Sequence, residues 1–362
     1  MSSLILDNPN RGAAEAAAYQ FCSDFCSNAS DPKYILGRNL YAASVAKHIK
    51  IDGFVDDYTS DNGYLGCPVI KLADVPKNAL VLNVAGGRPL SARRRLDEAG
   101  LRNLDYFAFY KLSGFPLTPM RFNEGFEEEF NANKENYAWI YGLFCDENSR
   151  HIFKKLVSFR LDYDIEHLAG FTWREDVQYF ENFLSLRTEG ETFIDIGGYN
   201  GYTSLEFIKR CPGYKSIHIF EPVPNNYQYC LESLHGIRDV HIYNTGLFRN
   251  KATLKLDMQG SASRVSQDGT VAILVDRLDD VLSAVPTFIK MDIEGEEIAA
   301  LEGARHTILA YHPRLAISVY HRPGDFWKIP QLILSIREDY DVCVRHYTEC
   351  IYETVMFFIP RP

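Results

Sequence analysis

The chain contains an apolar strand that runs into a glycine-rich turn, Thr192 to Gly201, with the pattern Asp-x-Gly-x-x-x-Gly. A second apolar strand, Ser216 to Phe220, follows a helical pattern and ends on Glu221. Glycines let the backbone approach a ligand, and an acid about 20 residues further on can accept hydrogen bonds from a ribose diol. Because the spacing is not Gly-x-Gly-x-x-Gly, we expect S-adenosylmethionine here rather than a dinucleotide.

A third strand, Phe288 to Asp292, brings several charges to a strand end. Alternation along a strand places Lys290, Asp292 and Glu294 on one side. Charges gathered at the carboxyl end of a sheet are costly unless they are paired or used. They could orient a substrate hydroxyl, hold a divalent metal, or form an ion-pair network. Two carboxylates without a clear third ligand leave a metal open, and we do not predict one.

His321 follows another predicted strand, Leu315 to Tyr320, and therefore lies at the same edge of the sheet. A neutral imidazole is well suited to take a proton from a hydroxyl near pH 7. We therefore predict His321 as a general base, with a structural hydrogen bond to Asp325 as the alternative. The aromatic segments Phe171–Arg174 and Tyr179-Phe180 either line an acceptor pocket or belong to the core.

Alternating strands and helices in the last part of the chain predict a parallel sheet. Its final two strands are separated by a few residues only, so they form an antiparallel hairpin. Together these elements predict a Rossmann-like α/β domain closed by a hairpin. The predicted strands are Thr192–Ile196, Ser216–Phe220, Val240–Asn244, Phe288–Asp292, Leu315–Tyr320, Asp341–Tyr347 and Ile351–Ile359.

The first part of the chain predicts a smaller Rossmann-like α/β domain. Its strands are expected at Asp31–Gly37, Gly53–Asp57, Cys67–Ile70 and Leu80–Ala85, with helices at Leu40–Lys50 and Ser91–Ala99. Pro116 and Pro119 mark a boundary, and residues 124–186 form a mostly helical pattern. We thus predict three parts, with residues 1–115 as the small domain, 116–190 as a helical connector and 191–362 as the larger domain.

Four segments of the larger domain resemble the FkbM-type family of S-adenosylmethionine-dependent methyltransferases. They are Phe193–Tyr202, Phe220–Pro224, Ile289–Glu297 and Ala300–Ala304, and the resemblance covers roughly Tyr179 to Pro360. It implies that Asp195 faces the methionine amino group of the cofactor. The resemblance and the strand ends together predict cofactor contacts from Asp195, Gly197, Tyr199, Asn200, Gly201, Glu221, Pro222, Asn244 and Asp292. The predicted catalytic residues are His321, Asp292, Glu294 and Lys290.

The small domain resembles nucleotide-sugar-binding domains attached to some sugar acyltransferases. Gly37, Asp56-Asp57 and Gly86-Gly87-Arg88 would form such a site at its strand ends. A domain that serves docking or oligomerisation fits the same pattern equally well. The ligand of this part and the oligomeric state are therefore left open.

Composition limits the partners. The net charge of −10 argues against a general grip on nucleic acid, and no apolar run approaches a membrane span. The amino terminus lacks the pattern of a secretory signal, and the eight cysteines have no metal or disulfide spacing. We therefore expect a cytoplasmic protein with reduced thiols.

These observations predict an O-methyltransferase that uses S-adenosylmethionine. Its acceptor would be a small molecule, namely a sugar, a nucleotide-sugar or a small metabolite. Two rivals are a non-catalytic nucleotide-sugar-binding protein and an NAD-dependent sugar-modifying enzyme. The missing Gly-x-Gly-x-x-Gly disfavours the second rival.

Overall fold

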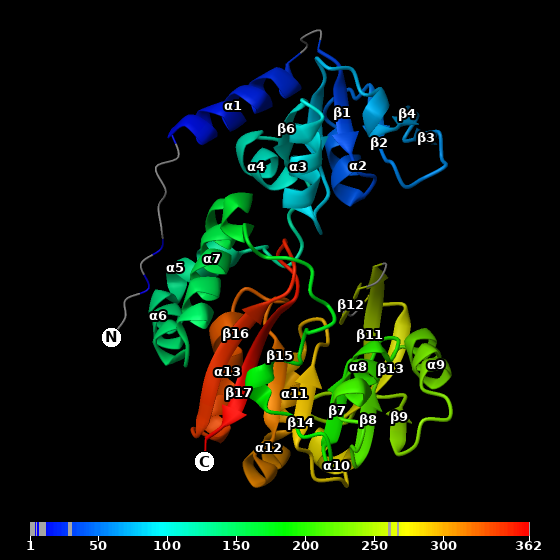
Figure 1. Cartoon of the computed structure of the whole chain (residues 1–362), viewed down its shortest axis with the longest axis vertical. Helices are drawn as coiled ribbons and strands as arrows, with labels where there is room; N and C mark the ends of the chain where they lie inside the picture. Colours follow the sequence, from blue (N-terminus) through cyan, green and yellow to red (C-terminus); the bar gives the residue numbers. More distant parts are fainter. Residues whose placement is uncertain are drawn as a thin grey trace.

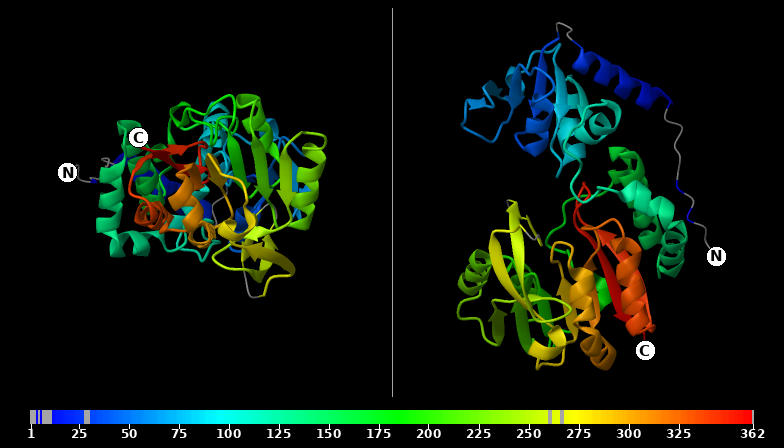
Figure 2. Two further views of the ribbon diagram at one scale, coloured as in Figure 1. Left: turned by 90° about the horizontal axis from the view of Figure 1, so that it is seen from below. Right: turned by 180° about the vertical axis from the view of Figure 1, so that it is seen from behind.

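The computed structural model describes Leu4, Leu6 and residues 12–27, 31–259, 262–265 and 268–361. A small α/β unit lies at one end of the molecule and a larger one at the other, with a group of helices beside the larger unit (Figures 1 and 2). Among the described residues, no helix combines the length and the apolar character needed to cross a bilayer.

The small unit is built on a six-stranded sheet, which we name the first sheet. Its strands are parallel except for the short edge strand β3. The order is β3 (Gly63–Tyr64), β4 (Cys67–Ile70), β2 (Gly53–Val55), β1 (Lys33–Leu36), β5 (Leu80–Asn83) and β6 (Arg102–Asp105). Its helices are α1 (Gly12–Cys26), α2 (Leu40–Ala46), α3 (Pro89–Glu98) and α4 (Tyr106–Leu112). The four predicted strands are confirmed, whereas α1, α4, β3 and β6 were not predicted.

Three helices follow the first sheet and pack on the larger unit. They are α5 (Phe126–Ala132), α6 (Lys134–Leu143) and α7 (Glu147–Asp162), followed by 3₁₀ turns at Ile165–Leu168 and Asn182–Leu184. Their apolar faces share one core with the larger unit, in which Phe126, Tyr137 and Phe153 join Ile317 and Val344. The prediction of a mostly helical segment is therefore right as far as Leu168. From residue 169 to 186 it is wrong, because the chain there is irregular apart from the turn at Asn182–Leu184.

A disulfide joins these helices to the larger unit. Cys145, between α6 and α7, is bonded to Cys343 with Cα atoms 5.9 Å apart. The expectation of eight reduced cysteines is therefore wrong for this pair. The two residues are 198 positions apart, and only the packing of the helices on the sheet brings them together. The other six cysteines are free.

The larger unit is built on a seven-stranded sheet, which we name the second sheet. Strands β7, β8, β9, β14 and β15 are parallel, and the hairpin β16–β17 adds two antiparallel strands. The order is β16 (Tyr340–His346), β17 (Thr354–Pro360), β15 (Arg314–Ser318), β14 (Phe288–Met291), β7 (Thr192–Ile196), β8 (Ser216–Phe220) and β9 (Val240–Tyr243). All seven predicted strands are present. The helices are α8 (Tyr202–Arg210), α9 (Pro224–Ser233), α10 (Leu278–Val281), α11 (Glu297–Glu302), α12 (Arg305–Tyr311) and α13 (Asp325–Ile336).

A further four-stranded sheet is inserted between β9 and β14, and the sequence had not predicted it. Its order is β10 (Gly246–Leu247), β13 (Val271–Asp276), β11 (Ala252–Gln259) and β12 (Ala262–Val265). Val223, Leu256, Ile273 and Val275 form its small core. The mixed α/β class with Rossmann-like sheets is thus confirmed, and the division into three parts stays a prediction.

Candidate active site

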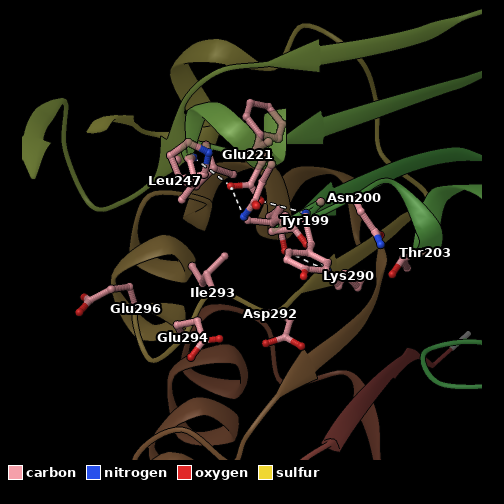
Figure 3. Close-up of a pocket in the computed structure, with 18 of the residues that line it drawn as sticks. Tyr199, Asn200, Thr203, Glu221, Leu247, Lys290, Asp292, Ile293, Glu294 and Glu296 are labelled. Carbon is pink, nitrogen blue, oxygen red and sulfur yellow. Dashed lines mark hydrogen bonds between the residues drawn. The ribbon is translucent and has the colours of Figure 1, made fainter. Parts of the chain in front are cut away.

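A cavity of about 520 Å³ lies at the carboxyl ends of the second sheet. Gly197 follows β7, Glu221 follows β8 and Asp292 follows β14, and all three line it. Figure 3 shows Glu221 and Asp292 on the cavity. Strand order reverses between β7 and β14, since the chain runs outward through β8 and β9 on one side and returns through β14 on the other. Open α/β sheets bind ligands at such a reversal.

The close packing of the protein around the glycine turn restricts which residues can occupy it. Gly197 has a φ of 83°, and a Cβ there would lie 1.9 Å from the backbone oxygen of Asp292. A Cβ on Gly198 would lie 2.3 Å from the side chain of Ile219. Both positions therefore exclude larger residues, because β7 packs directly against its neighbours. Tyr199 and Asn200 line the cavity, as predicted.

Glu221 lies at one end of the cavity, and backbone groups satisfy part of the hydrogen-bonding capacity of its carboxylate. Oε2 accepts a hydrogen bond from the backbone N–H of Tyr199, and Oε1 accepts one from that of Val223, both at 2.9 Å. A carboxylate has about four lone-pair positions, so acceptor capacity remains for ligand hydroxyls. Burial raises the pKa of Glu221, and the backbone N–H groups oppose that effect.

Asp195 lies behind the glycine turn. It is fully buried, with Lys290 Nζ 3.0 Å from Oδ1 and Ser204 Oγ donating to Oδ2 at 2.8 Å. Lys290 also donates to the backbone oxygen of Gly197 at 2.6 Å. Burial acts to lower the pKa of Lys290, but Asp195 and Asp292 outweigh it and raise that pKa. The contacts of Lys290 with Asp195 and Gly197 thus connect the glycine turn to β14. Asp195 is not among the lining residues, and its contact with a cofactor stays a prediction.

Asn244 is turned towards the backbone. Its Nδ2 donates to the backbone oxygens of Glu221 and Pro222, at 3.1 and 3.2 Å, and it is not among the lining residues. Pro222 lines the cavity, as predicted. The segment Gly246–Phe248 lines it where Asn244 was expected. Asn244 as an adenine contact therefore stays a prediction that this geometry does not favour.

Asp292 faces the cavity at the end opposite Glu221 (Figure 3). Its Oδ2 accepts a hydrogen bond from the hydroxyl of Tyr179 at 2.6 Å. Its Oδ1 lies 3.3 Å from Nε2 of His321. Burial, together with the negative charges of Asp292 and Glu353, raises the pKa of Tyr179 well above its ordinary value. Tyr179 therefore stays a hydrogen-bond donor that fixes Asp292.

Glu294 lies beside Asp292 on the same rim (Figure 3). Its backbone has a φ of 59°, which is uncommon for a residue with a side chain. Within the described part of the chain, its buried Oε2 has no hydrogen-bond partner, and Arg121 Nη2 lies 4.0 Å away. Burial raises the pKa of Glu294 to about 7, with Asp292 adding to the rise and His321 and Arg121 opposing it.

His321 is buried behind the cavity wall between two carboxylates. Its Nδ1 lies 2.9 Å from Oε1 of Glu297 and its Nε2 3.3 Å from Asp292. Burial acts to lower the pKa of His321, but Glu297, Asp292 and Glu294 outweigh it and raise that pKa to about 10. The imidazole is therefore a cation near pH 7 and does not line the cavity. This geometry does not favour His321 as a general base.

The structure supplies a metal-ligand set that the sequence had lacked. Ligand atoms of Asp292, Glu297 and His321 all lie within 4.8 Å of one another. Each ring nitrogen of His321 lies within ion-pair distance of a carboxylate, but neither has a hydrogen-bond partner among the described residues. These contacts are those of an ion-pair network, and we do not predict a metal here.

The comparisons with known proteins agree with this geometry. Residues 195–347 match the family described as the methyltransferase FkbM domain. This part of the chain is therefore similar to FkbM methyltransferase domains, and we refer to residues 195–347 as the FkbM domain.

Solved structures give the fold of the whole chain. A methyltransferase FkbM from Methylobacillus flagellatus KT is 24% identical over 97% of this chain and 100% of that chain, with a TM-score of 0.73. An rRNA methylase from Streptococcus thermophilus is 13% identical over 52% of this chain and 97% of its own, with a TM-score of 0.36. No curated protein matches.

The sequence missed part of the cavity lining near Asp292. Tyr320 and Glu353 line the cavity, and the Tyr320 hydroxyl donates to Oε1 of Glu353 at 3.4 Å. Gln178 also lines it and donates to the other oxygen of Glu353. Burial and Asp292 raise the pKa of Glu353 to about 7. The sequence placed Glu353 inside a predicted strand, but β17 begins at Thr354, so Glu353 belongs to the turn.

The cavity of the FkbM domain is strongly acidic. Among its lining residues the acids outnumber the single basic side chain, Lys290, which is already paired with Asp195. The acids are Glu175, Glu221, Asp292, Glu294, Glu296 and Glu353. An anionic group inside the cavity would therefore meet net repulsion.

The predicted site of the first sheet is largely occupied by internal ion pairs. Arg38 Nε lies 2.9 Å from Asp56, and the same guanidinium contacts Asp61. Asp57 accepts from the backbone N–H of Leu72 at 2.8 Å and pairs with Arg95. A nucleotide-sugar site here stays a prediction.

Proposed function

We propose that the protein is an S-adenosylmethionine-dependent O-methyltransferase that acts on a hydroxyl of a sugar or a related small molecule. One observation supports this most. A single cavity has a partly used carboxylate, Glu221, at one end and a carboxylate with a pKa near 7, Glu294, at the other.

The cofactor would occupy the end of the cavity beside the glycine turn. A cavity of about 520 Å³ is within the range of small-molecule sites. The free lone pairs of Glu221 suit a ribose diol, and Gly246–Phe248 with Val223 offers an apolar wall for a flat base. When bound, S-adenosylmethionine supplies an electrophilic methyl group.

The residues of the acceptor end would orient and deprotonate the attacking hydroxyl. A base with a pKa near the working pH has both a populated anion and a useful driving force, and Glu294 and Glu353 both have a pKa of about 7. Glu294 is the better base, because its Oε2 has no hydrogen-bond partner among the described residues, whereas both oxygens of Glu353 accept hydrogen bonds. Asp292, held by Tyr179 and His321, would accept a second hydrogen bond from the acceptor and fix its direction. His321 would act through Asp292, and Lys290 through the glycine turn. Positioning of this kind accounts for much of the rate of a displacement reaction.

The acidic lining restricts the acceptor. A neutral or amine-bearing polyhydroxyl group suits the six carboxylates, whereas a phosphate does not. If the acceptor is a nucleotide-linked sugar, the sugar enters the cavity and the diphosphate stays outside.

Two measurements test the proposal. Calorimetry with S-adenosylhomocysteine, NAD and UDP-sugars should show that S-adenosylhomocysteine binds and that this binding depends on Glu221. Mass spectrometry on a panel of sugars and nucleotide-sugars should show one added methyl group and an equal amount of S-adenosylhomocysteine. Binding of NAD or UDP-sugars without S-adenosylhomocysteine would instead favour one of the two rivals.

A further inference from the structure

We infer that the segment Leu117–Asn123, which lies outside the FkbM domain, supports the acceptor end from outside the cavity, and that Arg121 is a positioning residue for Glu294. This inference rests on the proposed function, because it concerns the base of that reaction. It gives the first sheet and its helices a role in methyl transfer.

The segment is tied to the small unit at three points. The backbone N–H of Thr118 donates to Oγ of Ser44 at 2.8 Å, and its carbonyl accepts from the hydroxyl of Tyr106 at 2.6 Å. The backbone N–H of Arg121 donates to the hydroxyl of Tyr41 at 3.3 Å. Tyr41 and Tyr106 are buried in the core of the first sheet. The position of Arg121 therefore depends on that core.

The same segment is tied to the acceptor end by a buried cation. Arg160, which is 2% exposed, donates to the backbone oxygens of Phe122 at 2.6 Å and of Tyr320 at 3.2 Å. Burial lowers the pKa of Arg160 to about 10, so it remains charged near pH 7. The Phe122 ring packs edge-on against Tyr320 and His321, with centroids 5.6 and 5.2 Å apart. Tyr320 and His321, two residues of the site region, thus pack directly against Phe122.

Arg121 brings a positive charge to Glu294 from outside the FkbM domain. Its Nη2 lies 4.0 Å from Oε2, and its guanidinium lies over the ring of Phe122 at 4.8 Å. The other charged groups facing Glu294 are Asp292, Glu297 and His321. Of these groups, the carboxylates favour the protonated acid, and the cations Arg121 and His321 favour the carboxylate. Arg121 therefore helps to keep the base ionised.

The decisive variants are Arg121→Gln and Arg121→Lys in the full chain. Partly exposed pairs are worth a few tenths of a kcal/mol to about 1 kcal/mol. We therefore expect Arg121→Gln to move the acidic limb of kcat/KM upward by about half a pH unit. Turnover should fall about threefold at pH 6.5 and recover near pH 8.5, while affinity for S-adenosylhomocysteine stays unchanged. Arg121→Lys should restore the profile, and Arg249→Gln, which removes a surface pair with Glu302, should not alter it.

A measurement without substrate separates this inference from the proposed function. Carbon-13 NMR of the glutamate carboxyls, with the Glu294 signal assigned by its loss in Glu294→Gln, should show the same upward shift in Arg121→Gln. An unchanged Glu294 titration would overturn the role of Arg121 even in an active enzyme. A shifted titration in a protein that methylates nothing would sink the proposed function but leave the contact established.

Discussion

Replacing Glu294 by Gln removes the proposed base and keeps the shape of its side chain. A positioned base contributes about 10²- to 10⁴-fold to a rate. Asp292 remains beside the acceptor, but Tyr179 and His321 already engage both of its oxygens. We therefore expect kcat to fall by at least about a hundredfold, with affinity for S-adenosylhomocysteine nearly unchanged.

The pH dependence of kcat/KM tests the same assignment. With a pKa of about 7, wild-type kcat/KM should fall about tenfold for each pH unit below 7. In the Glu294→Gln variant, kcat/KM should no longer show this fall below pH 7. Because the folded pKa lies above the ordinary 4.5, the folded state binds the proton more tightly than the unfolded chain. The contribution of Glu294 to stability therefore declines as pH rises from about 4.5 to 7. Above pH 7 the Gln variant should be at least as stable as the wild type.

The assay is S-adenosylhomocysteine release between pH 5.5 and 9, with urea unfolding at pH 8 alongside. Glu302→Gln is the matched control, since Glu302 lies nearby on α11 and pairs with Arg249 on the surface. Full turnover in a folded Glu294→Gln protein would refute the assignment. A lost limb in His321→Ala but not in Glu294→Gln would return the base to His321.

Three further changes test the cofactor end. Glu221→Ala should weaken S-adenosylhomocysteine binding by roughly ten- to a hundredfold in calorimetry, since charge-assisted hydrogen bonds contribute about 1.5 to 3 kcal/mol; unchanged affinity would remove Glu221 from the site. Lys290→Met should lower the free energy of unfolding by about 3 to 5 kcal/mol, because Asp195 is then buried without its partner, and adding Asp195→Asn should recover part of it. Gly197→Ala should cost at least about 2 kcal/mol through the clash with Asp292, and an unchanged urea midpoint would contradict the close packing.

Much of the fold could be predicted because the signals are local. Each strand of the second sheet is a short apolar run bounded by polar or glycine residues, and all seven were found. The inserted sheet was missed although β13 contains a continuous apolar run, Val271–Val275. In β11 apolar and polar residues alternate, with exposed Lys255 beside buried Leu256, so no continuous apolar run marks that strand. The disulfide was missed because the packing of the helices on the sheet, and not the spacing of the cysteines in the sequence, brings its two cysteines together.

The lining residues could be predicted better than their roles. Residue type and position at a strand end identified Glu221, Asp292 and Glu294, and all three line the cavity. Glu353 was not assigned a role there, because a turn brings it in, and Tyr179 was expected either in an acceptor pocket or in the core. Burial and partners, which decide the charge state, come from residues far apart in the chain.

His321 and Glu294 illustrate how burial and charged neighbours change which residue is favoured as the base. In water an imidazole is the natural base near pH 7 and a carboxylate is not. In this fold Glu297 and Asp292 face both ring nitrogens and make the imidazole a cation, while burial raises the Glu294 pKa to the range that catalysis needs. The two residues thus exchange the roles that their ordinary pKa values suggest. Since each depends on the charge of the other, removing the His321 cation should raise the pKa of Glu294 further. A His321→Gln variant should therefore retain activity at pH 9 and begin to lose it at a higher pH than the wild type does. A profile that falls equally at every pH would show that His321 acts on the acceptor directly.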